Sequence, residues 1–507
     1  MPDPISDTEA KPDLAKRQRE QVQALLARAP ATGSGRVTTA AGATLDYQVR
    51  AAFVPVYTAG LDAERGEPQA AVLTTAYTVA TPPDRPQRGV CFAFNGGPGS
   101  ASLWLHLGAL GPKRVPVDDN GRLLPAPYGL VDNPHTWLGQ FDLVFIDPPH
   151  TGWSASASDA ARKKHLSVDG DVAVMAEVVR GWLAANGRFG APLYLCGESY
   201  GTTRGAAIAD ALLDLGLGLD GVILVSCAMD LQSLVFAPRN DLPHALFLPA
   251  YATTAQYHGA LDGALGASGE AARQAAEAFV AEDYLSALHA GARLDGTRRR
   301  RIAKRLCELT GLPRAVVEEH NLRIRDSAFF VEALRARGQL VGRLDSRATA
   351  PMAATREREM AFDPGIEGIA VPYTTAAMAY FATLGLPVEQ RYEALNFDAH
   401  RQWDWRRGKG EGMVEANGFT STGDDLARAL RRNPNTRVLV ASGRYDLGTP
   451  YSATDWSLAQ LDAPAEVLAR ISHRYYDAGH MMYTRSADLA QMQADLAAWL
   501  QAPAAAG

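Results

Sequence analysis

The pentapeptide Gly-Glu-Ser-Tyr-Gly at positions 197–201 constrains the fold of this 507-residue chain more than any other stretch. Before it, residues 191–196 (APLYLC) are typical of a short buried strand, and after it residues 202–215 place apolar side chains at helical spacing. A serine between two glycines at a sharp strand-to-helix turn is typical of an exposed nucleophile. The motif alone leaves a second interpretation open, in which Ser199 is a turn residue or a helix cap.

A catalytic serine needs a base and an acid that orients the base, and the C-terminal part of the chain offers one candidate for each. Asp446 closely follows residues 436–442 (TRVLVAS), an apolar run typical of a buried parallel strand. His480 lies between an aromatic pair and a predicted C-terminal helix. A loop histidine taken alone is more often a solvated polar residue. The order Ser199, Asp446, His480 is that of α/β-hydrolase triads, so we expect His480 to be the general base and Asp446 to orient its imidazole.

Strand and helix patterns alternate around the serine, which predicts an α/β class with a mostly parallel central sheet. Helical patterns then dominate residues 231–420, before the pattern of the sheet returns. We therefore predict an α/β-hydrolase fold with an N-terminal arm (1–35), a core formed by residues 36–230 and 421–507, and a large helical cap inserted at 231–420. A separate helical domain with its own partner is the alternative for that interval.

Further motifs make the chain resemble the serine carboxypeptidases of the S10 family. Residues 94–100 (FNGGPGS) and 110–112 (LGP) resemble that family's Asn-Gly-Gly element and the Leu-Gly-Pro segment behind it. Residues 133–137 (NPHTW) and 145–154 (FIDPPHTGWS) resemble the segment that follows. Combined with the serine and histidine motifs, these matches are spread over much of the chain. The small number of cysteines indicates a bacterial-type member.

The resemblance implies a role for each residue around the serine. The backbone N–H groups of Gly97 and Tyr200 would form the oxyanion hole, and Asn95, the Gly96 N–H and Glu198 would bind the substrate's terminal carboxylate. A carboxylate that binds another carboxylate requires a shared proton, which raises the pKa of the pair.

One departure concerns the acidic residue that the family commonly places beside that carboxylate. This chain has Ala109 at the position. Alanine cannot share a proton, so we expect the acidic pair to be absent or rebuilt from elsewhere. We also expect peptidase activity to extend closer to neutral pH than is usual for the family.

These observations favour a serine-type carboxypeptidase that acts on peptides through an acyl-enzyme. Two alternatives stay open, an esterase or acyltransferase that uses the same triad and a non-catalytic binding protein that retains the fold. The chain has no zinc-ligand spacing, so no metal and no cofactor are expected. The four cysteines are interpreted as small buried hydrophobic residues; they are Cys91, Cys196, Cys227 and Cys307.

The overall charge and hydropathy exclude several partner classes. A formal net charge of −6 disfavours nucleic acid, and no apolar run approaches the length needed to span a bilayer. Residues 1–19 lack the apolar core of a signal peptide. We expect a cytoplasmic location, or a periplasmic or secreted one if a leader was removed. The assembly is left open, with a homodimer as one alternative.

Overall fold

The computed structural model describes residues 11–57, 66–82, 84–408 and 418–502. Within these residues, ten strands form one sheet in the order β1-β2-β3-β7-β4-β9-β10-β13-β14, with β8 (Ala155–Ser156) beside β3. The strands from β1 to β7 pair antiparallel along this order, and those from β7 to β14 pair parallel. Their bounds are β1 Ala31–Thr38, β2 Thr44–Tyr57, β3 Pro68–Val79, β7 Phe141–Ile146, β4 Gly89–Phe94, β9 Leu193–Glu198, β10 Gly221–Val225, β13 Arg437–Gly443 and β14 Ile471–Tyr476.

Both faces of the sheet are buried at its middle, which explains why strands such as β4 and β10 are apolar throughout. In β4, Cys91 and Ala93 belong to one hydrophobic cluster, whereas Phe92 and Phe94 belong to the other. Successive strand residues point to opposite faces, so a strand covered on both sides needs apolar residues at every position.

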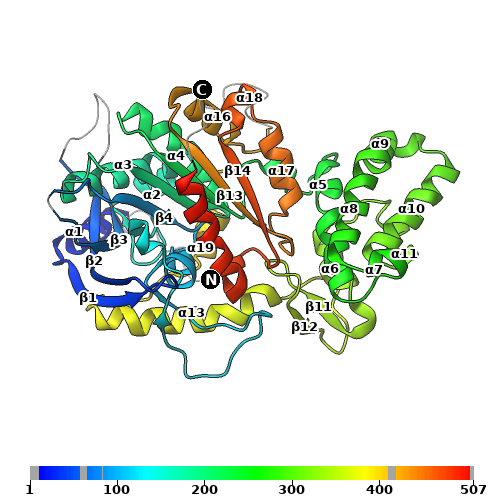
Figure 1. Ribbon diagram of the computed structural model, residues 1–507, viewed down its shortest axis with the longest axis horizontal. Helices are drawn as coiled ribbons and strands as arrows, with labels where there is room; N and C mark the ends of the chain where they lie inside the picture. The colour runs from blue at the N-terminus through cyan, green and yellow to red at the C-terminus, as the bar shows by residue number, and fades with distance from the viewer. Residues whose placement is uncertain (1–10, 58–65, 83, 409–417, 503–507) are drawn as a thin grey trace, which may run out of the picture.

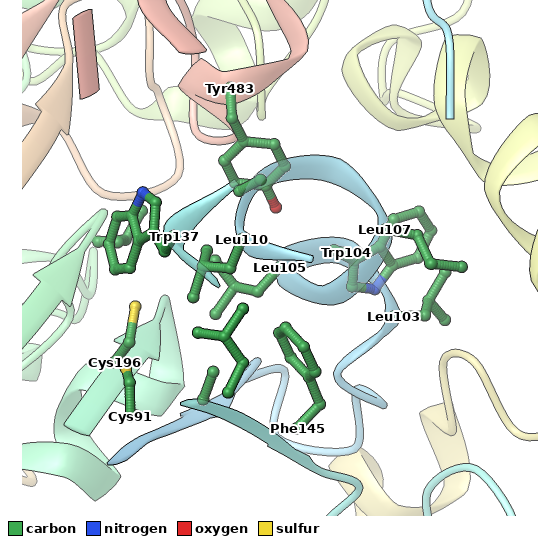
Figure 2. Packing of buried hydrophobic residues seen from close by; sticks show 14 of the residues in the cluster. Cys91, Leu103, Trp104, Leu105, Leu107, Leu110, Trp137, Phe145, Cys196 and Tyr483 are labelled. Carbon is green, nitrogen blue, oxygen red and sulfur yellow. The ribbon is translucent and has the colours of Figure 1, made fainter. Parts of the chain in front are cut away.

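Helices cover the sheet on each side. One cluster contains residues of α3 (Val168–Asn186), α4 (Tyr200–Asp214) and α16 (Gly423–Arg432). The opposite cluster contains residues of α13 (Pro364–Thr383), α19 (Ser486–Gln501) and a π-helix at Leu105–Leu110. Figure 2 shows this second cluster, in which side chains of the π-helix lie close to several buried aromatic residues, including Trp137, Phe145 and Tyr483.

The N-terminal interval that was expected to be an arm contributes to the core. Helix α1 (Lys11–Ala27) packs through Val22 and Leu25 against residues of β3 and β8. Strand β1 then begins at Ala31. The sequence ATGSGRVT of β1 is rich in small and polar residues, so its alternation was too weak to indicate a strand.

Residues 231–420, which were expected to form a cap, contribute to two different hydrophobic clusters. The first helices of this interval form a separate hydrophobic cluster beside the sheet, at the right of Figure 1. They are α5 Leu242–Leu246, α6 Leu248–Tyr257, α7 Gly263–Gly266, α8 Gly269–Phe279, α9 Leu285–Ala290, α10 Gly296–Thr310, α11 Arg314–Glu319 and α12 Asp326–Glu332. After the hairpin β11 (Gln339–Val341) and β12 (Thr349–Pro351), helix α13 returns to the sheet, because its Tyr373 and Phe381 belong to the core. Across the described ranges, no helix combines the length and apolar character that crossing a bilayer requires.

Candidate active site

Ser199 occupies a strained turn between β9 and α4. It has a φ of 60° and a ψ of −129°, and residues other than glycine rarely adopt a positive φ. The glycines on either side permit it, because a Cβ on Gly197 would lie 2.6 Å from the carbonyl carbon of Gly201. The turn is the strand–turn–helix arrangement that the sequence predicts.

Asp446 and His480 meet at the carboxyl edge of the same sheet. His480 Nδ1 donates to Asp446 Oδ2 at 2.7 Å, and both side chains are buried. Asp446 also accepts the backbone N–H groups of Gly448 and Thr449, at 2.7 and 2.9 Å, and the Thr449 hydroxyl at 2.7 Å. These donors fix the carboxylate in one orientation, which in turn fixes the imidazole.

The electrostatics of this pair favour charge separation. Burial raises the pKa of Asp446, but His480 and the hydrogen bonds from Thr449 outweigh it, and the pKa lies below the ordinary value. Burial lowers the pKa of His480, but the Asp446 carboxylate outweighs it, and the pKa lies above the ordinary value. An imidazole that accepts a proton is therefore stabilised here.

Ser199 lies on the cavity next to this pair. The cavity has a volume of about 480 Å³, and Ser199 lines it together with Gly448 and Thr449, which hold Asp446. Within the described residues, no hydrogen bond joins the Ser199 hydroxyl to the imidazole, so this link of the triad stays a prediction.

The Asn-Gly-Gly loop packs directly against the start of α4. A Cβ on Gly96 would lie 2.6 Å from the Gly201 nitrogen and closer still to the Tyr200 nitrogen, so only glycine fits. Gly97 has a φ of 101° and lines the same cavity as Ser199 and Tyr200. The loop and the nucleophile turn thus lie as close together as the predicted oxyanion hole requires.

Asn95 and Glu198 lie side by side beneath this loop. The Asn95 Oδ1 accepts the Leu105 N–H at 3.0 Å. Glu198 is buried and accepts the Tyr483 hydroxyl at 2.7 Å. Burial raises the pKa of Glu198 to about 7, against the opposing effects of His480, Tyr483 and Asn95. The carboxyl group therefore keeps its proton close to neutral pH.

Tyrosines lie beside Glu198 at the place where the family commonly has a second acid and this chain has Ala109. Ala109 lies on the buried π-helix, and a Cβ on the preceding Gly108 would lie 2.6 Å from the Tyr483 ring. Tyr373 is buried there as well. Among the described residues, no hydrogen bond joins Glu198 to a second carboxyl group, and the Tyr483 phenol contacts it instead.

A buried ion pair, not predicted from the sequence, ties the loop to the nucleophile helix. Arg204 Nε donates to Asp171 Oδ2 at 2.7 Å, with both side chains about 1% exposed. Arg204 Nη1 also donates to the Asn95 carbonyl at 2.7 Å, and its guanidinium lies over the rings of Phe94 and Tyr200. The sequence signal that could have indicated this ion pair is an arginine among small residues, about one helical turn after Ser199.

Metal ligation has no candidate in this part of the molecule. Among the residues that the structure describes, no group of three or more His, Cys, Asp and Glu side chains could hold a metal ion.

Comparison with known proteins connects this geometry to a family. The family model described as serine carboxypeptidase matches residues 77–217, which include the Asn-Gly-Gly loop and Ser199. Over these residues the chain is similar to the serine carboxypeptidase family. Serine-type carboxypeptidase F of Aspergillus niger is 28% identical over 124 residues, which are 24% of this chain and 20% of that protein. The chain thus matches about a fifth of this relative's length.

A solved structure supports the fold. The structure of Kex1Δp, a prohormone-processing carboxypeptidase from Saccharomyces cerevisiae, aligns with a TM-score of 0.54 and 12% identity. The alignment covers 89% of this chain and 91% of that chain. The predicted α/β-hydrolase fold is confirmed.

Proposed function

We propose that the protein is a serine-type carboxypeptidase that removes C-terminal residues from peptides through an acyl-enzyme. The observation that carries the proposal is the buried Asp446–His480 pair at the edge of the sheet where the strained Ser199 lines a cavity. The match of residues 77–217 to the serine carboxypeptidase family model supports the same activity.

The proposed reaction has two halves. Ser199 Oγ attacks the scissile carbonyl while His480 Nε2 takes its proton, and Asp446 stabilises the imidazolium. The oxyanion accepts the Gly97 and Tyr200 N–H groups. Collapse breaks the C–N bond, and His480 returns the proton to the leaving amine. Water then attacks the ester with His480 again as the base, which releases the shortened peptide and restores Ser199.

Recognition of the terminal carboxylate is assigned to Asn95, the Gly96 N–H and Glu198. A neutral Glu198 can donate a hydrogen bond to a carboxylate, whereas an ionised one repels it. A pKa of about 7 supports this role over the acidic and near-neutral range. It also supports the expectation that activity extends toward neutral pH.

An esterase or acyltransferase is the second candidate. Ala109 favours this second candidate, because weaker binding of a terminal carboxylate would relax the requirement for a free C-terminus. The same triad serves both reactions.

Two measurements test the proposal. A fluorophosphonate should label the protein, and Ser199→Ala should abolish labelling, whereas Ser286→Ala, an exposed serine of the helical insertion, should not. Peptides with a free C-terminus should then be cleaved with a higher kcat/KM than their C-terminal amides. Equal values would remove the carboxypeptidase assignment and leave the second candidate.

A further inference from the structure

The cavity at Ser199 contains a cation that forms no ion pair with any described residue. Arg343 lines it with an exposed side chain, and among the described residues no hydrogen bond or ion pair involves its guanidinium. A second arginine of the cavity differs in this respect. Arg406 donates to Asp404 at 2.7 and 2.8 Å, so its charge is already compensated.

Backbone hydrogen bonds join the loop that carries Arg343 to the loops that carry Asp446 and His480. The Arg343 carbonyl accepts the Leu447 N–H at 2.9 Å, next to Asp446. The following carbonyl, of Leu344, accepts the His480 N–H at 2.6 Å. Asp363 accepts the N–H groups of Arg343 and Leu344, at 2.7 and 3.1 Å. Arg343 is thus held at a defined place beside the reaction centre.

The guanidinium lies close to the floor of the cavity. A Cβ on Gly448 would be 3.5 Å from the Arg343 Cζ, and Gly448 is the residue whose N–H binds Asp446. Burial raises the pKa of Asp326, the one acid among the described residues that line this cavity, and the Arg343 charge is close enough to oppose that rise, but no ion pair joins the two side chains. An anionic group that enters the cavity therefore meets an available partner.

The position of Arg343 indicates which side of the scissile bond it serves. Under the proposed function, the leaving residue's carboxylate binds at Asn95 and Glu198, whose side chains are almost fully buried and do not line this cavity. The cavity is then left for the residue on the acyl side. Its other walls are apolar, with Leu231, Leu234 and Phe247 among them.

We propose that Arg343 is a specificity-determining residue that binds a substrate carboxylate, the acidic side chain of the residue on the acyl side of the scissile bond. Apolar walls contact the methylene stem of a glutamate, and the guanidinium accepts its charged end in the paired geometry that arginine and carboxylate form. The inference rests on the proposed function for the direction in which the peptide lies.

The test measures binding rather than turnover, so that it is read separately from the proposed function. Two peptides that differ only in Glu or Gln at the penultimate position are titrated against the Ser199→Ala protein. We expect the Glu peptide to bind about tenfold more tightly, as for a charge-assisted hydrogen bond at a partly exposed site. Arg343→Gln in the same background should remove the difference, and Arg343→Lys should retain part of it.

Arg406→Gln is the matched control, because it removes a cation of the same cavity whose charge Asp404 already compensates. It should change the ratio of the affinities for the Glu and Gln peptides far less than Arg343→Gln does. An unchanged ratio in Arg343→Gln would overturn the proposal. So would a loss confined to the comparison of free-acid and amide peptides, because Arg343 would then bind the terminal carboxylate. Failure of the proposed function would show instead as an absence of trimming by the unmodified protein.

Discussion

Glu198 is predicted to destabilise the folded protein at neutral and alkaline pH, and Glu198→Gln tests this. Its carboxyl group has a pKa of about 7 in the folded protein, against 4.5 as the ordinary value. The folded state therefore binds this proton more tightly than the unfolded chain does. The contribution to stability is fully favourable below pH 4.5 and is lost as the pH rises through 7.

The expected size follows from the two pKa values. At about 1.4 kcal/mol for each tenfold change in proton affinity, ionised Glu198 costs about 3 kcal/mol. Glutamine is neutral at every pH and can still accept the Tyr483 hydroxyl. Denaturant unfolding of Glu198→Gln should therefore give a higher free energy of unfolding than the unmodified protein at about pH 8, and a similar one at about pH 4.

Activity should change with the same substitution. For free-acid peptides, kcat/KM of the unmodified protein should fall above neutral pH by about tenfold per pH unit, since Glu198 loses its proton. Glu198→Gln should remove this alkaline limb.

Tyr483→Phe is the matched control for the pKa of Glu198. The Tyr483 hydroxyl lowers that pKa, so its removal should shift the alkaline limb to higher pH. An alkaline limb that persists in Glu198→Gln, or a stability difference that is equal at both pH values, would refute the reasoning.

Three further substitutions test the framework of the site. Asp171→Ala leaves the buried Arg204 without its partner and should lower the free energy of unfolding by about 3–5 kcal/mol in a denaturant titration; a loss below ~1 kcal/mol would contradict this. Gly96→Ala introduces a methyl group against the Tyr200 nitrogen and should lower kcat/KM about 100-fold or more while circular dichroism shows a folded protein, so normal kinetics would exclude the close approach. Asp446→Asn should lower kcat by about 10⁴-fold, and a loss of less than about tenfold would separate Asp446 from the triad.

The sequence predicted the features that depend on local pattern. The strand, turn and helix around Ser199 follow from glycine spacing and apolar periodicity, and the place of Asp446 follows from an apolar strand that ends in a loop. The contact between Asp446 and His480 was predicted from chain order, because both lie after strands that end at the same edge of the sheet.

Other features depend on contacts between distant residues, which no local pattern encodes. Tyr483 is one residue of a loop near the C-terminus, and only the fold places its hydroxyl on Glu198. Arg343 follows a three-residue strand in the insertion, and its position is set by the Leu447 N–H, which binds its carbonyl, and the His480 N–H, which binds the carbonyl of the next residue, Leu344. The sequence of helix α13 predicts one more helix of the cap, whereas its packing against the sheet depends on side chains of other elements.

The division of the core into two stretches of chain has a consequence for biosynthesis. The hydroxyl of Ser199 belongs to the first stretch, and its proposed base, His480, belongs to the second, beyond the helical insertion. A ribosome adding ~5–20 residues per second needs roughly tens of seconds to pass from one to the other. During that time the emerging polypeptide carries Ser199 without its proposed general base, so the proposed acyl-transfer chemistry begins only after His480 has been made.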